Sequence, residues 1–303
     1  MGNDDARVVE GAIPGDMAGE RLDRAAILVL PDTGLRGRRR LIEAGRLLVD
    51  GRARPAAYRV RAGEKLAARI AARPEGEFRA SDIPILFADA AYAAVAKPAG
   101  LHSAAIACGG GQSLEDLLPE LFPGRAAGLL SRLDRLTSGI VPLAFDAASG
   151  ERYRRLENAG QVAKTYLAVV HGGIPSPFVV DFRLDMADRA KTRVLRTADS
   201  DPLRQTRVSP RAAKGGLTLV ACRIAKGARH QIRAHLAASG HPLVGDPVYG
   251  RGEGARLYLH CARLESPVLT VTNQPPWSLA EAARTVESDA LEKNAEQDTN
   301  GVG

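Results

Sequence analysis

Short apolar runs separated by turn residues constrain the fold of this chain more than any other feature of its sequence. In residues 129–145, two apolar runs bracket a polar segment that contains Thr137, Ser138 and Gly139. Runs of this length bounded by turn residues predict two strands joined by a loop. They are also far shorter than the roughly 20 apolar residues that a membrane-spanning helix needs. The sequence therefore predicts a sheet-containing protein that does not cross a membrane.

The polar segment places one carboxylate between two guanidinium groups. Asp134 lies between Arg132 and Arg135, on a loop that the two predicted strands hold in place. A carboxylate in such a loop can act as a nucleophile or stabilise positive charge. The simpler alternative is a surface ion pair with one of the two arginines. Asp134 is therefore a candidate catalytic residue whose role depends on what the rest of the chain brings to it.

The composition fits a soluble protein of more than one domain. The 303 residues are 45% hydrophobic and 25% charged, which is ordinary for a chain with a sizeable core. The N-terminus lacks the basic-then-apolar pattern of a signal peptide, so we expect a cytoplasmic protein. Cys108, Cys222 and Cys261 include no CxxC pair, and this spacing predicts neither a disulfide framework nor a zinc site.

Residues 19–70 predict one small domain. Their apolar spacing indicates two short helices, the second of which ends at Gly45, a residue that suits the left-handed position after a helix. Asp50 and Gly51 then separate two apolar runs, and this pair is typical of a two-residue hairpin turn. The expected order is helix, helix, hairpin.

Positive charge is concentrated in this small domain. It holds 13 Lys and Arg against six Asp and Glu, so its net charge of +7 equals that of the whole chain. The densest cluster lies at the predicted start of the second helix, where backbone N–H groups and the helix dipole already favour a phosphate. The domain is similar to the S4 RNA-binding domain. This resemblance implies RNA contacts by Arg36, Arg38, Arg39 and Arg40.

The segment around Asp134 resembles the HRLDRxTSG motif of the RluA family of RNA pseudouridine synthases. Ser131 stands where the motif usually has His. The resemblance implies that Asp134 is the catalytic residue, that Arg132 belongs to the substrate pocket and that Arg135 contacts RNA.

Residues 162–170 predict a strand that presents a cation and an aromatic ring together. With a period of two, Lys164 and Tyr166 point to the same face. The run is similar to the KxYxA strand of the same family, in which the Tyr packs against the target uracil. By this resemblance Tyr166 is catalytic and Lys164 lines the substrate pocket. Residues 257–264 resemble the last core strand of the family, in which Leu259 would be a wall of the uracil pocket. From Tyr166 alone, an aromatic residue in an ordinary sheet would be the simpler interpretation.

Residues 226–236 predict a helix that carries Arg233. Ile232 and Leu236, at i and i+4, can form its buried stripe. The segment resembles the family motif GRxHQIRxHL, in which Arg233 would be the arginine that pairs with the catalytic Asp. Ala228 stands where the family usually has Arg.

Three histidines near this helix raise the question of a metal site. His230, His235 and His241 show neither an HExxH pattern nor a cysteine partner at ligand spacing, so we expect no metal. The resemblance instead assigns His230, with Arg229, to RNA binding. Moving a glycosidic bond from N1 to C5 of uracil is redox-neutral, so the implied reaction needs no cofactor.

The domain boundaries follow from composition. Residues 1–18 are predicted to be a mobile leader, and residues 71–84 a linker, because they carry Pro and Gly without periodicity. Residues 85–277 form the predicted catalytic domain. Residues 278–303 turn acidic and are predicted to be a disordered or weakly helical tail. The expected fold class is α+β, with a small S4 domain and a catalytic domain built on a mixed, mainly antiparallel sheet.

The sequence thus predicts a monomeric synthase that converts uridines of structured RNA to pseudouridine, with ribosomal RNA favoured over transfer RNA by the S4 resemblance. One alternative is an RNA-binding or ribosome-assembly factor that has lost activity, because Ser131 and Ala228 depart from the family motifs. A synthase acting on transfer RNA is another. A hydrolase that uses Ser131 or Ser138 with a histidine lacks a nucleophile-elbow pattern.

Overall fold

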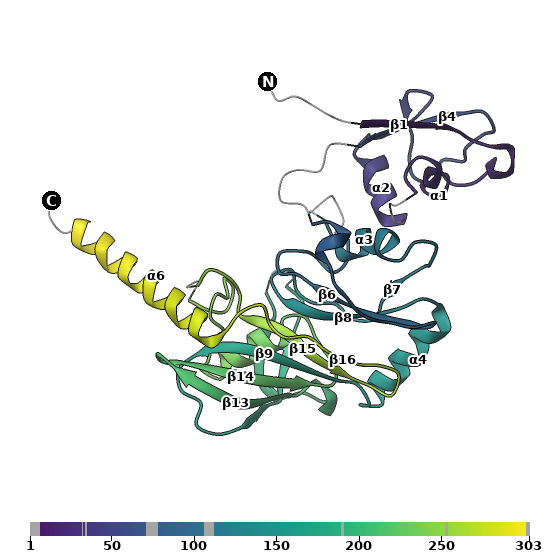
Figure 1. The fold of residues 1–303 in the computed structure, drawn as a ribbon. Coiled ribbons are helices and arrows are strands. Elements are labelled where there is room, and N and C mark those ends of the chain that lie inside the picture. Colours follow the sequence, from purple (N-terminus) through teal and green to yellow (C-terminus); the bar gives the residue numbers. More distant parts are fainter. Residues whose placement is uncertain are drawn as a thin grey trace. The chain divides into compact units, whose positions relative to one another are not determined.

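The computed structural model describes residues 7–31, 33, 35–70, 78–105, 112–188, 191–251 and 254–300. The chain forms two compact units (Figure 1). The first unit comprises residues 1–83 and 101–129, and the second comprises residues 84–100 and 130–303. No helix within the described ranges is long and apolar enough to cross a membrane.

The first unit contains a small sheet with the strand order β1-β4-β2-β3. Its core is formed by buried residues such as Leu22, Leu47 and Leu66. In chain order the elements of this unit are β1 (Arg7–Ala12), η1 (Gly15–Met17), α1 (Leu22–Ala25), η2 (Ala26–Leu28), α2 (Leu35–Glu43), β2 (Leu47–Val49), β3 (Arg52–Ala53), β4 (Lys65–Ile70), η3 (Ala80–Asp82), α3 (Leu114–Leu121) and β7 (Gly128–Leu129).

The helices and the hairpin of residues 19–70 lie where the sequence predicts them. Gly45 follows α2 with φ = 66°, in the left-handed region that a helix-ending glycine adopts. Asp50 and Gly51 join β2 to β3 with φ angles of 47° and 71°. Positive φ at both central residues is the geometry of a type I′ turn.

The prediction of a mobile leader over residues 1–18 is wrong for the described part of that segment. β1 pairs with β4 along its whole length, from Arg7 opposite Ile70 to Ala12 opposite Lys65. Ile13, just after β1, is 2% exposed and belongs to the core of this unit. The pairing satisfies the backbone groups of β4 that would otherwise form a free sheet edge.

The second unit is built on one large sheet with the strand order β10-β13-β14-β9-β15-β8-β6-β5, and β16 pairs with β15. Its elements are β5 (Ile85–Ala88), β6 (Tyr92–Lys97), β8 (Ser138–Ala144), α4 (Ala147–Asn158), β9 (Ala163–His171), β10 (Phe178–Val180), β11 (Phe182–Asp185), β12 (Arg193–Ala198), η4 (Pro202–Arg204), β13 (Thr206–Lys214), β14 (Leu217–Ile224), α5 (Gln231–Ala238), β15 (Leu259–Glu265), β16 (Thr270–Thr272) and α6 (Leu279–Asn300).

The sheet is mixed and mainly antiparallel, as the sequence predicts. Its parallel pair is β15 with β8, where His260 lies opposite Ser138 and Cys261 opposite Gly139. All other neighbours along the strand order pair antiparallel. The parallel contact brings the end of the Asp134 loop next to β15.

The two faces of the sheet have different environments. On one face, Tyr166 of β9 lies directly opposite Cys261 of β15 and Cys222 of β14. On the other face, Leu167 and Val169 pack against α6. Directly paired residues point to the same side of a sheet, so the registers assign each residue of these strands to one face.

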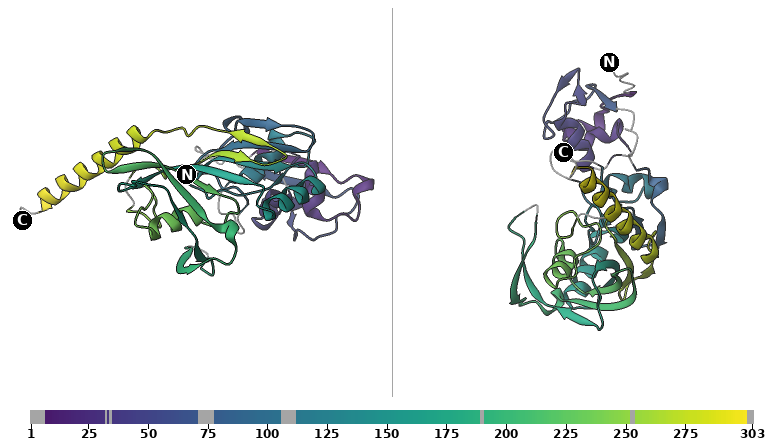
Figure 2. Two further views of the ribbon diagram at one scale, coloured as in Figure 1. Left: turned by 90° about the horizontal axis from the view of Figure 1, so that it is seen from below. Right: turned by 90° about the vertical axis from the view of Figure 1, so that its left-hand side faces the viewer.

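Residues 279–300 form α6, where the sequence predicted a disordered or weakly helical tail. The start of the helix docks on the sheet through Ala282 and Ala283, which pack with Trp277 and Tyr258. Asp289 accepts a hydrogen bond of 2.6 Å from the Gly254 N–H. These contacts order the first turns, and the helix then continues beyond the sheet (Figures 1 and 2).

Candidate active site

The loop that carries Asp134 is fixed by backbone hydrogen bonds at both ends. The Thr137 N–H donates to the Asp134 carbonyl at 3.1 Å, and the Gly100 N–H donates to the Arg135 carbonyl at 2.8 Å. Lys97 donates from Nζ to the Pro98 and Arg135 carbonyls, at 2.8 and 3.3 Å. Burial lowers the pKa of this lysine to about 7. Lys97 therefore holds the loop in place by hydrogen bonds to its backbone. The sequence analysis did not predict this role.

Gly139 allows the loop to approach β15. Its φ is 117°, and a Cβ atom added there would lie 2.3 Å from the Cys261 carbonyl oxygen. A side chain at this position would push β8 away from β15 at the point where the two strands pair. The glycine of the TSG segment that follows Asp134 is therefore required by the sheet geometry.

Arg233 of α5 reaches two carboxylates at once. Its Nη1 donates to Asp134 Oδ2 at 3.0 Å, which brings together the two residues that the sequence had paired. Its Nε and Nη2 donate to Asp246 Oδ2 and Oδ1, both at 2.8 Å. The guanidinium thus forms a bidentate pair with Asp246 and donates a single hydrogen bond to Asp134.

Asp246 is the residue of this site that sequence reasoning missed. Its side chain is fully buried, and Oδ1 also accepts from the Val248 and Tyr249 N–H groups at 2.9 and 3.1 Å. Burial acts to raise the pKa of Asp246, but the hydrogen bonds and charge of Arg233 outweigh it and hold the pKa below its usual value. Asp246 therefore anchors Arg233 as a carboxylate. The sequence shows a carboxylate at this position, but only the fold shows that it faces Arg233.

His230 lies beside Asp134, although the sequence assigned it to RNA binding. Its Nε2 is 3.8 Å from Asp134 Oδ2, and its Nδ1 is 3.0 Å from the Tyr249 hydroxyl. Burial lowers the pKa of His230. The residue has φ = 56°, an uncommon angle for a residue other than glycine. Tyr249 also lies under the Arg233 guanidinium, 5.3 Å from Cζ to the ring centroid.

Tyr166 and Leu259 share the sheet face that the sequence predicted for the substrate pocket. Tyr166 is 7% exposed, and burial raises the pKa of its phenol well above 10. Leu259, 3% exposed, lies opposite Ala168, two residues along β9. Lys164 is on the same face, but its Nζ is 2.5 Å from Glu157 Oε1 of α4. The lysine is therefore committed to an ion pair with the helix.

The arginines around the site have different environments. Arg132 and Arg135 are exposed, and Asp134 pairs with Arg233 and His230 instead of with its sequence neighbours. The Arg229 guanidinium is half-buried and donates to the carbonyls of Met186 and Asp188, which lie between β11 and β12. A surface ion pair within the RLDR segment is thus not the arrangement of this carboxylate.

A contact between a serine and a histidine bears on the hydrolase alternative. Ser138 Oγ lies 2.9 Å from His260 Nδ1, and His260 Nε2 lies 3.1 Å from the Asn273 carbonyl. The two residues are only 3% and 2% exposed. A hydroxyl buried in this way between β8 and β15 is not available as a nucleophile, and the contact instead fixes the parallel strand pair.

The burial of His260 makes the stability of the protein depend on pH. Burial lowers the pKa of His260 from 6.5 to about 4, so the unfolded chain binds more protons between these values. We expect the free energy of unfolding to fall by roughly 2–4 kcal/mol as the pH drops from 6.5 to 4. Denaturant titrations across this range should show a smaller loss for His260→Gln. An equal loss in the variant would contradict this assignment.

In the first unit, two of the four predicted RNA-binding arginines have structural partners. Arg39 Nε donates to the fully buried Asp23 at 2.6 Å, and Arg21 donates to the same carboxylate at 3.1 and 3.0 Å. Arg38 Nη1 donates to the Arg24 carbonyl at 3.1 Å. The side chains of Arg36 and Arg40 lie outside the described part of the structure.

The described residues contain no group of three or more His, Cys, Asp or Glu side chains placed to hold a metal ion. Cys222 and Cys261 are buried free thiols, and burial raises the pKa of each to about 12.

This chain is similar to known proteins in sequence and in fold. A family model described as RNA pseudouridylate synthase matches residues 91–238. A ribosomal large subunit pseudouridine synthase D from Nitrosomonas europaea is 33% identical over 80% of this chain and 72% of its own length. The Pseudomonas aeruginosa protein of the same name is 32% identical over 78% and 76%. The solved structure of human RNA pseudouridylate synthase domain containing 4 superposes with a TM-score of 0.55 at 24% identity, covering 67% of this chain and 92% of that one.

Proposed function

The chain belongs to the RNA pseudouridylate synthase family, and on that premise we propose that it isomerises uridines of ribosomal RNA with Asp134 as the catalytic carboxylate. The observation that carries the proposal is the 3.0 Å contact between Asp134 and Arg233, whose other nitrogens are held by the buried Asp246. This arrangement fixes one cation against one partly exposed carboxylate. A positioned charge of this kind is what a reaction without metal or cofactor requires.

The chemistry assigns a role to each neighbour. The glycosidic bond must break at N1 and re-form at C5, and the hydrogen on C5 must leave. Asp134 has 23% of its side chain exposed, so it can reach the sugar or the base. Tyr166 and Leu259 supply the apolar face against which the uracil stacks, which offsets part of the cost of unstacking it from the RNA. The exposed Arg132 and Arg135 flank the carboxylate and would contact the phosphates beside the extruded nucleotide.

Ribosomal RNA is proposed as the substrate because the two relatives described above are named for the large ribosomal subunit. Residues 19–70, which carry a net charge of +7 and resemble an S4 domain, would supply additional phosphate contacts through the Arg36–Arg40 cluster. Arg38 and Arg39 would contribute less than their charge suggests, because their guanidinium groups already bond to Arg24 and Asp23. We further propose that the protein acts as a cytoplasmic monomer.

Release of tritium from uridine C5 tests the function directly. We expect the wild-type protein to release label from C5-tritiated ribosomal RNA that lacks pseudouridine, with no added cofactor and equally in the presence of a chelator. Transfer RNA labelled in the same way should release less. Release from transfer RNA alone would show that transfer RNA, and not ribosomal RNA, is the substrate. No release from either RNA would favour an inactive assembly factor.

A further inference from the structure

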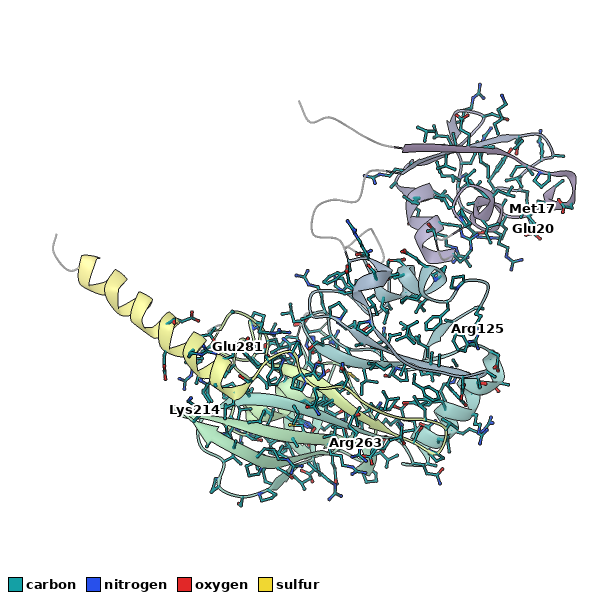
Figure 3. All side chains as sticks on the ribbon, in the orientation of Figure 1. Met17, Glu20, Arg125, Lys214, Arg263 and Glu281 are labelled. Atoms are coloured by element: carbon teal, nitrogen blue, oxygen red, sulfur yellow. The ribbon has the colours of Figure 1, made fainter. Side chains whose placement is uncertain are left out.

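Three arginines form a row on the sheet face opposite Tyr166. Arg207 of β13 pairs with Arg223 of β14, and Arg223 pairs with Thr165 of β9. Thr165 in turn pairs with Arg263 of β15. Because paired residues share a face and neighbours in a strand alternate, this row lies on the other side of the sheet from the catalytic residues. Figure 3 labels Arg263 on this part of the sheet.

The row is open to solvent. The side chains of Arg223 and Arg263 are 57% and 51% exposed, and Arg207 is also exposed. α6 covers the same face further along the strands, where it packs near Leu167 and Val169. α6 therefore does not cover the three arginines.

The charges in the row are not balanced. Glu265 Oε1 lies 2.9 Å from Arg263 Nη2, and Glu265 Oε2 lies 3.9 Å from Arg223 Nη1. One carboxylate therefore forms ion pairs with two guanidinium groups. Arg207 has no ion pair to any residue in the described ranges, and it lies directly opposite Arg223. Like charges at directly opposed positions destabilise a sheet. An external anion would relieve this repulsion.

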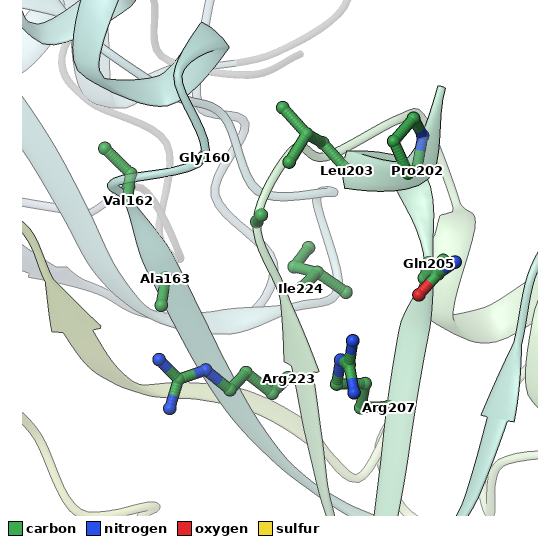
Figure 4. A pocket seen from close by; sticks show the side chains of 10 residues that line it. Gly160, Val162, Ala163, Pro202, Leu203, Gln205, Arg207, Arg223 and Ile224 are labelled. Atoms are coloured by element: carbon green, nitrogen blue, oxygen red, sulfur yellow. The ribbon is translucent and has the colours of Figure 1, made fainter. Parts of the chain in front are cut away.

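A hollow adjoins the two unbalanced arginines. It has a volume of 160 Å³, and Figure 4 shows Arg207 and Arg223 on its lining together with Gln205. The partly exposed Leu203 adds apolar surface, and the lining also includes Val162 and Ile224, which are 0% and 5% exposed. The volume is well below the roughly 300–1,000 Å³ of pockets that enclose a whole small molecule. It suits one planar group that enters from a chain lying across the surface.

We propose that this row and its hollow form a second RNA-binding surface, which takes a distal segment of the substrate RNA on the face opposite the active site. Guanidinium groups match phosphate oxygens with paired N–H donors, and the hollow offers apolar walls and an amide to one unstacked base. The inference rests on the proposed function, because it is an RNA substrate that would supply the phosphates.

Salt dependence of RNA binding tests the surface. In the full-length protein, Arg207→Gln with Arg223→Gln should weaken binding to unmodified large-subunit ribosomal RNA. The slope of log affinity against log salt should become shallower by about 1.4–1.8 for two lost phosphate contacts. The turnover number at saturating RNA should be unchanged, because neither residue faces the catalytic side. On the shortest RNA fragment that still releases tritium, the double variant should bind as the wild type does.

A matched control separates contact from net charge. Arg152→Gln with Arg155→Gln removes the same charge from exposed positions of α4. An unchanged salt slope for the Arg207 and Arg223 variant, or an equal change in the control, would overturn the proposal. Equal weakening on the short and the long RNA would do so too. Absence of tritium release by the wild type is a separate outcome, which would refute the proposed function while the slopes still report on binding.

Discussion

Asp134→Asn abolishes pseudouridine formation and leaves RNA binding intact: this is the largest effect that we expect. The amide keeps the size of the side chain and can still accept the hydrogen bond from Arg233, which now spans 3.0 Å to Asp134 Oδ2. It removes the negative charge on which the proposed catalytic role of Asp134 depends. Loss of a residue of this kind lowers the turnover number by roughly 10⁴-fold or more. Tritium release measures the loss of turnover, and RNA affinity measured on the same preparation checks that binding is retained.

Glu151→Gln, at an exposed position of α4, is the matched control for this loss of one negative charge. It should retain wild-type rates. If Asp134→Asn released label as fast as the wild type, another group would have to be the catalytic carboxylate. If it lost RNA affinity as well, its role would include binding.

The second large effect concerns the buried Arg233–Asp246 pair. Arg233→Leu strands the fully buried Asp246 carboxylate, and breaking a buried pair in this way costs about 3–5 kcal/mol of stability. Asp246→Leu leaves the guanidinium short of its bidentate partner and should cost a similar amount. Combining Arg233→Leu with Asp246→Leu should restore part of the stability, because apolar residues can replace a buried ion pair but cannot accept from the Val248 and Tyr249 N–H groups. All three variants should be inactive. Urea titrations and tritium release separate the two effects.

Arg233→Lys separates the geometry of the guanidinium from its positive charge. An ammonium group cannot hold Asp246 by two parallel hydrogen bonds and contact Asp134 with a third donor in the same plane. Misplacement by about 1 Å is sufficient to reduce turnover by roughly 100-fold. A lysine variant with full activity would show that a point charge is enough, and would remove the orienting role of Asp246.

Local patterns predicted the elements whose structure depends on nearby residues. The turn at Asp50 and Gly51 has the φ angles that its sequence requires, and the alternation in residues 162–170 placed Tyr166 and Lys164 on one face of β9. β1 was missed because its partner β4 begins more than 50 residues later. No local period reveals such a pairing. α6 was missed for a related reason, since the apolar surface that orders its first turns comes from distant strands.

The candidate site shows the same limit. The family motifs identified Asp134 and Arg233, and the fold brings them within hydrogen-bonding distance. Sequence gives the charge of an arginine but not what that charge is bonded to. Arg39 is held by a carboxylate 16 positions earlier, and the Arg229 side chain is held by carbonyls about 40 positions away. Asp246 could not be assigned a role until the fold placed it against Arg233.

The long separation along the chain between Asp134 and Arg233 also sets an order of events during translation. The two residues are 99 positions apart, and Asp246 follows Arg233 by a further 13. At about 5–20 residues per second, the ribosome adds Arg233 roughly 5–20 s after Asp134. Through that interval the nascent chain carries its carboxylate without the cation that orients it. A chain that is stalled or truncated before α5 would therefore have a basic surface that can bind RNA, but it would lack Arg233 and Asp246.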